Sequence, residues 1–63
     1  MNRAAYRDGL IAGAEQRAQL SEDEIINGII PSLERAICDC QEMGWAHLET
    51  YFRGKLDGVS KAE

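Results

Sequence analysis

The fold is decided by one stretch, residues 21–57, which reads SEDEIINGIIPSLERAICDCQEMGWAHLETYFRGKLD. It contains both cysteines and the single histidine, tryptophan and proline of the 63-residue chain. It opens with Ser21 and, three residues later, Glu24, the spacing of a capping box in which each side chain bonds the other residue's N–H. Glu22 and Asp23 add negative charge at the positive end of the helix dipole. The sequence therefore predicts a helix that begins at Ser21.

A single apolar stripe follows that start. At about 100° per residue, the large apolar side chains share one arc of roughly 140°, and polar residues occupy the opposite side. The stripe keeps its phase across Gly44, which favours one uninterrupted helix over residues 22–57. The members of the stripe are Ile25, Ile26, Ile29, Ile30, Leu33, Ala36, Ile37, Cys40, Met43, Gly44, His47, Leu48 and Tyr51.

Two residues favour a different arrangement. Pro31 lacks an N–H and its ring crowds the preceding turn, so we expect a kink there. Gly44 can end the helix, with Trp45 folding back on Cys40 in a Schellman arrangement and packing inward. A third helix would then return and give a three-helix bundle. Against a break, residues 44–47 contain no good N-cap, so the continuous helix is the preferred prediction.

A first helix is predicted over residues 3–19, which are rich in good helix formers. Asn2 is its expected N-cap. Gly9 and Gly13 lie four residues apart and therefore share a face with Ala5, which would let another helix approach closely. Two helices joined by a short connection predict an antiparallel hairpin.

The connection and the tail complete the predicted domain, which spans residues 1–63. Leu20 precedes the Ser21 cap, and we expect it to pack on Ile25 as a hydrophobic staple. Gly58 is interpreted as a helix stop, followed by a frayed tail. The predicted fold class is all-α: a helical hairpin with one short and one long amphipathic helix.

This hairpin would leave apolar surface uncovered. The short helix is about 25 Å long and the long helix about 54 Å, so the short one covers only half of its partner. A soluble monomer seldom exposes such a patch, and a twofold homodimer would cover it and complete a helical bundle. A break at Gly44 would weaken this argument. The residues predicted at the dimer interface are Ile37, Cys40, Gly44, Leu48 and Tyr51.

Composition narrows the classes of function. Eleven acidic and seven basic residues give a net charge of -4, and the basic residues are dispersed. Direct nucleic-acid binding is therefore disfavoured. The sequence has no apolar run long enough to span a membrane and no secretory leader, so we expect a cytoplasmic protein.

No catalytic or metal-binding motif stands out. On a helix, Cys38 and Cys40 point about 200° apart, so they cannot form a disulfide with each other. Together with His47 they do not match a zinc pattern, and we expect His47 to be a half-buried core residue. Two or three short helices leave little room for an enzyme pocket. The sequence therefore predicts neither an enzyme nor a cofactor.

The preferred function is regulation by protein–protein interaction, by a homodimeric inhibitor or modulator of a larger protein. Size and class alone support an analogy with phage or mobile-element accessory factors. Aromatic side chains are common interface anchors, and an acidic surface can complement a partner. The residues predicted to bind the partner are Trp45, Phe52, Glu42 and Glu49.

Two alternatives belong to other classes. One is a nucleic-acid-linked transcriptional regulator in which Arg3, Arg7 and Arg17 from two protomers make a basic face. The other is a structural subunit of a larger assembly.

Overall fold

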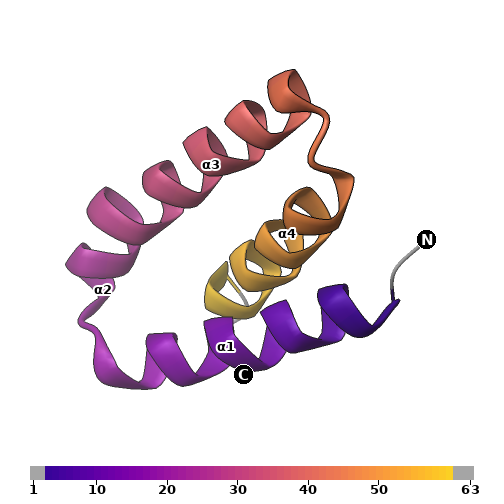
Figure 1. The fold of residues 1–63 in the computed structure, drawn as a ribbon. Coiled ribbons are helices and arrows are strands. Elements are labelled where there is room, and N and C mark those ends of the chain that lie inside the picture. Colours follow the sequence, from indigo (N-terminus) through magenta and orange to yellow (C-terminus); the bar gives the residue numbers. More distant parts are fainter. Residues whose placement is uncertain (1–2, 61–63) are drawn as a thin grey trace.

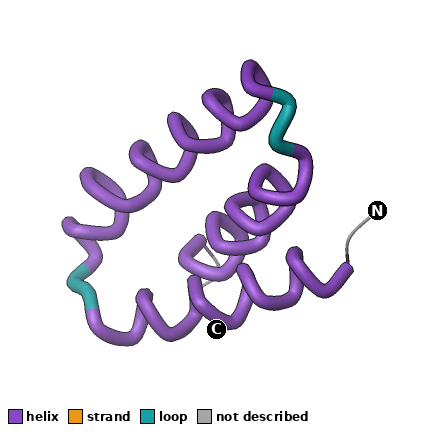
Figure 2. Tube along the Cα trace, in the orientation of Figure 1, coloured by secondary structure: helices purple, strands orange, loops and turns teal. Residues whose placement is uncertain are grey.

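The protein is described by a computed structural model over residues 3–60, and the regular secondary structure within that range is entirely helical. Helix α1 spans Arg3–Gln19, α3 spans Ile30–Met43 and α4 spans Ala46–Ser60. Between α1 and α3 lie the short α2 (Glu22–Glu24) and a π turn, η1 (Ile25–Ile29). Loops separate α1 from α2 and α3 from α4 (Figure 2). The all-α class and the first helix are confirmed, whereas the predicted N-cap, Asn2, lies outside the described residues.

The capping box at Ser21 is confirmed. The Ser21 hydroxyl accepts from the Glu24 amide at 3.3 Å, and the Glu24 carboxylate accepts from the Ser21 amide at 3.0 Å. These bonds, chiefly the one from the Ser21 backbone, lower the pKa of Glu24. Leu20 packs on the apolar cluster that contains the buried Ile25, as a hydrophobic staple would. The local sequence thus sets both the start of the helix and the angle at which the chain enters it.

The helix is irregular where the sequence has its proline. In η1 the Ile30 amide donates to the Ile25 carbonyl, five residues back. Pro31 follows immediately, within the first turn of α3. In a regular α-helix the Pro31 ring would clash with the carbonyl four residues earlier. The wider π turn lies directly before the turn that contains Pro31.

The continuous helix over residues 22–57 is wrong, because the chain turns at Gly44. Gly44 has φ 75° and ψ 23°, the left-handed conformation that ends many helices. The Trp45 amide donates to the Cys40 carbonyl at 2.9 Å and the Gly44 amide to the Gln41 carbonyl at 3.3 Å. These are the two bonds of a Schellman motif. The absence of a polar N-cap side chain does not prevent a new helix, since the Trp45 carbonyl accepts from the Glu49 amide.

The turn lets the second half of the stripe find cover within the chain. Figure 1 shows α4 returning from the end of α3 to lie against α1. Val59 is completely buried and joins Ile25 and Leu33 in the core. The partly buried side chains around this cluster are Leu20, Ile29, Ile30, Phe52 and Leu56. This burial is the physical reason that the break is favoured over a long exposed helix.

Gly58 does not stop a helix, contrary to the sequence-based expectation. Helix α4 continues through it to Ser60, and Gly58 is buried against α1. The rest of the predicted tail, residues 61–63, lies outside the described residues. Gly58 is therefore a packing residue.

Helices α1 and α4 meet through glycines on both sides. Gly9 faces Tyr51 and Gly54, whereas Gly13, one turn later, faces Gly58. Since the contacts advance together along both helices, α1 and α4 run in the same direction. A Cβ atom on Gly9, Gly13, Gly54 or Gly58 would come within 3.0 Å of backbone atoms of the facing helix. The close approach predicted for Gly9 and Gly13 is confirmed.

Replacing a glycine in this contact should weaken the fold. Gly9→Ala places a methyl group against the Tyr51 carbonyl, a backbone atom that cannot turn away. We expect a loss of about 3 kcal/mol in the free energy of unfolding, measured by urea titration with circular dichroism. Gly28→Ala is the matched control, because a Cβ there meets nothing within 4 Å. It should stabilise the protein by up to about 1 kcal/mol; equal losses in both variants would contradict the close contact.

Removing the cap should have a smaller effect. Ser21→Ala deletes the hydroxyl that accepts from the Glu24 amide, and we expect the free energy of unfolding to fall by about 1 kcal/mol. Ser32→Ala, at an exposed position inside α3, should leave it within about 0.5 kcal/mol of the wild type. The same urea titration measures both. An unchanged Ser21→Ala stability would mean that the cap does not contribute.

Candidate functional site

Large apolar side chains are exposed around the turn between α3 and α4. Met43, Trp45 and Leu48 are 60%, 51% and 42% exposed; we call these three residues the turn patch. The sequence predicted that Trp45 would pack inward if the helix ended at Gly44. The helix does end there, yet the Trp45 side chain does not pack inward. Its amide is fixed by the bond to Cys40, but its side chain remains half in solvent. The turn thus holds an indole at the surface on a well-defined backbone.

The predicted dimer residues are divided by the turn at Gly44. Ile37 and Cys40 are buried within the chain, and Tyr51 is half-buried. Gly44 and Leu48 remain exposed. Because buried side chains offer no surface to a second chain, the stripe is not available as one continuous interface.

The four predicted partner-binding residues are also separated. Glu42 and Trp45 are exposed next to the turn. Phe52 packs against the core cluster and meets the Tyr51 ring edge-on, with ring centroids 5.6 Å apart. Its burial reduces the surface that it can offer to a partner. His47 is exposed, so the prediction of a half-buried core histidine is wrong.

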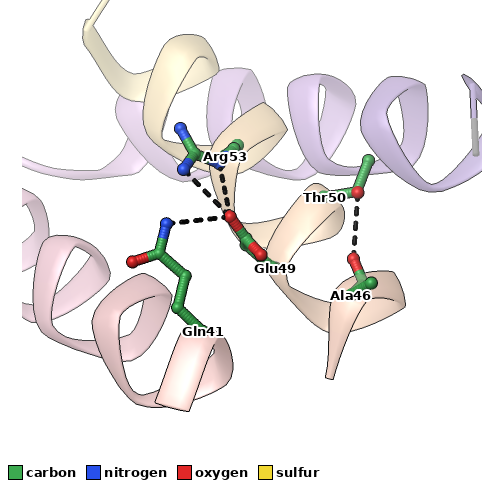
Figure 3. A network of polar contacts seen from close by, with 5 residues as sticks. All are labelled: Gln41, Ala46, Glu49, Thr50 and Arg53. Atoms are coloured by element: carbon green, nitrogen blue, oxygen red, sulfur yellow. Dashed lines mark hydrogen bonds and ion pairs between the residues drawn. The ribbon is translucent and has the colours of Figure 1, made fainter. Parts of the chain in front are cut away.

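Glu49, the fourth of these residues, is held by partners within the chain (Figure 3). Its carboxylate accepts from the Gln41 side chain at 3.0 Å and from Arg53 at 2.9 Å and 3.0 Å. The Gln41 bond, followed by the Arg53 bond, lowers the pKa of Glu49. Gln41 belongs to α3 and Glu49 to α4, so this network joins the two helices across the turn.

This network should make stability depend on acidic pH. The pKa of Glu49 is lower in the folded protein than in an unfolded chain. The ionised Glu49 carboxylate therefore stabilises the fold at pH values above the ordinary glutamate pKa. This stabilisation is lost as the pH falls through the folded value. Glu49→Gln should therefore show a shallower fall in Tm than the wild type between about pH 6 and pH 3. Glu42→Gln, at an exposed position on α3, is the control and should keep the wild-type slope; identical slopes for all three proteins would contradict a role for Glu49.

The three arginines of the predicted basic face do not lie together. Arg17 donates to the Val59 carbonyl near the end of α4 and is half-buried. Arg3 and Arg7 instead line an open cavity of about 650 Å³ together with Arg53. We call this cavity the arginine groove; its lining residues are Arg3, Tyr6, Arg7, Thr50 and Arg53. Arg53 was not predicted from the sequence, because only the parallel pairing of α1 with α4 brings it to Arg3 and Arg7.

The described residues form no disulfide, metal-binding cluster or membrane-spanning helix. Cys38 is exposed, Cys40 is buried and neither forms a disulfide. Within residues 3–60 no group of three or more His, Cys, Asp or Glu side chains is placed to hold a metal ion. No helix in the same range is both long and apolar enough to cross a membrane. Comparisons with family models, curated proteins and solved structures find no match to this chain.

Proposed function

We propose that the protein is a regulator that binds a larger protein through the turn patch. The observation that carries the proposal is Trp45, a tryptophan 51% exposed on a turn whose backbone is fixed by a Schellman motif. A tryptophan side chain buries about 150–250 Å² of surface when a partner covers it, and aromatic side chains of this size dominate the binding energy of interfaces. A rigid backbone lowers the entropy lost on binding.

The neighbours of Trp45 support the same use. Met43 and Leu48 are the other exposed large apolar side chains near the turn. Methionine adapts its shape to a partner, and apolar contacts around a central aromatic residue exclude water. Glu42, exposed next to Met43, would supply a charge at the polar rim that surrounds such a centre. Binding at such a patch can inhibit or modulate a partner without any reaction.

A second copy of the chain is the competing occupant of the patch. The homodimer expected from the long stripe would now have to use Leu48 and the residues around the turn. Light scattering at tens of micromolar separates the two possibilities. A monomer leaves the patch free for another protein, whereas a dimer that Leu48→Glu dissociates would assign it to self-association.

Trp45→Ala should reduce partner binding and leave the fold intact. We expect partner affinity to fall by about 2 kcal/mol or more, the loss typical of an interface hot spot. The free energy of unfolding should change by less than about 1 kcal/mol, because half of the side chain is already in water. Ile11→Ala is the matched control, since Ile11 is 49% exposed but lies on α1. Wild-type, Trp45→Ala and Ile11→Ala proteins serve as parallel baits in quantitative affinity capture, followed by affinity measurement with the captured protein.

The free protein provides a direct check on this assignment. Trp45 is the single tryptophan, so its emission reports on the turn patch alone. We expect red-shifted emission that acrylamide quenches readily. Blue-shifted emission that acrylamide quenches poorly, measured on a monomer, would show that Trp45 is buried within the chain. That result would contradict the proposal. Equal partner binding by Trp45→Ala and the wild type would contradict it independently.

A further inference from the structure

We propose that the arginine groove binds the carboxylate side chains of an acidic segment in the partner protein. This inference rests on the proposed function, because it names a second contact made by the same partner. The groove lies between α1 and α4 and has room for several side chains, with a volume of about 650 Å³. Binding sites for small ligands fall in the same range of size.

The groove contains positive charge that has no ion-pair partner in the described part of the chain. The chain has eleven acidic residues. Nevertheless, within residues 3–60 no carboxylate oxygen lies within the 4.0 Å ion-pair distance of the Arg3 or Arg7 guanidinium. Both side chains are exposed, one helical turn apart on α1. Because neither guanidinium has a carboxylate partner within residues 3–60, both keep their N–H donors available to an external anion.

The third arginine, Arg53, is held in position at the groove. Arg53 bonds Glu49 through Nε and Nη2, which fixes the guanidinium at the groove while leaving Nη1 for a further acceptor.

The first turn of α1 contains no acidic residue to offset the positive end of its dipole. Tyr6 donates to Asp57 and Thr50 to the Ala46 carbonyl, so both hydroxyls are held in place.

The arginines of the groove favour a carboxylate over other anions. The arginine fork matches a carboxylate in geometry and can donate two parallel hydrogen bonds to it. A nucleic acid would require a larger cluster or stripe of basic residues that follows its phosphate backbone. Here Arg17, the remaining arginine of α1, is occupied by the Val59 carbonyl, and the net charge of -4 opposes a long polyanion. The groove therefore fits a short acidic segment better than a nucleic acid.

Peptide titration of the intact protein tests the inference without the unidentified partner. The probes are a short acetylated peptide of alternating Glu and Leu, the same peptide with Gln in place of Glu, and a short single-stranded DNA. Nitrogen-15 NMR follows the arginine Nε–Hε signals. We expect the Glu peptide to shift the signals of Arg3, Arg7 and Arg53, and its affinity to fall as salt is added. The Gln peptide and the DNA should leave these signals unchanged.

Arginine variants locate the binding within the protein. Arg7→Gln should weaken binding of the Glu peptide about tenfold, the usual effect of removing a hydrogen bond to a charged group. Arg3→Gln provides a second variant in the groove. Arg35→Gln is the matched control, because it removes the same charge from an exposed site on α3 and should bind like the wild type. Circular dichroism confirms that each variant is folded.

Three outcomes would overturn the inference. They are equal binding of the Gln peptide, equal weakening by Arg35→Gln and Arg7→Gln, and tighter binding of the DNA than of the Glu peptide. The titration does not involve Trp45, so the groove can fail while the turn patch still captures a partner. Loss of partner binding in Trp45→Ala with an intact peptide response would support both surfaces.

Discussion

The structure depends on direct contact between the backbones of α1 and α4. Glycines at positions 9, 13, 54 and 58 remove the side chains that would otherwise hold these helices apart. Each glycine costs about 1 kcal/mol of helix propensity relative to alanine, roughly 4 kcal/mol for the four. Close packing and burial around Val59 must offset that cost. A chain of this size has few large side chains to bury, so the approach of the two backbones takes the place of a larger core.

The sequence predicted the local features well because their causes are local. The capping box needs only Ser21 and Glu24, and the first helix follows from composition and spacing. The break at Gly44 could not be decided in this way, since the apolar phase continues across it. What decides it is the non-local contact of Gly54 and Gly58 with α1. The spacing of these two glycines repeats that of Gly9 and Gly13, a signal present in the sequence that the interpretation of Gly58 as a helix stop overlooked.

The candidate sites were less predictable for the same reason. The sequence predicted Trp45 as a partner-binding residue, but periodicity could not show whether the indole faces the core after a turn. Arg3 and Arg7 were assigned to a basic face with Arg17, the next arginine along the helix. The structure instead places them with Arg53, because α1 and α4 run in the same direction. Glu49 now connects the two surfaces, since Arg53 lines the groove and Gln41 lies beside the turn.

The pairing of the first helix with the last also affects how the protein is made. Gly9 contacts Gly54, which lies 45 residues later in the chain. At ribosomal rates of about 5–20 residues per second, α1 waits roughly 2–9 s before its packing partner has been synthesised. During that interval its glycine-rich face has no partner, and a helix of this length is marginal alone in water. Nascent α1 therefore lacks the contacts that cover this face in the folded protein until α4 has been synthesised.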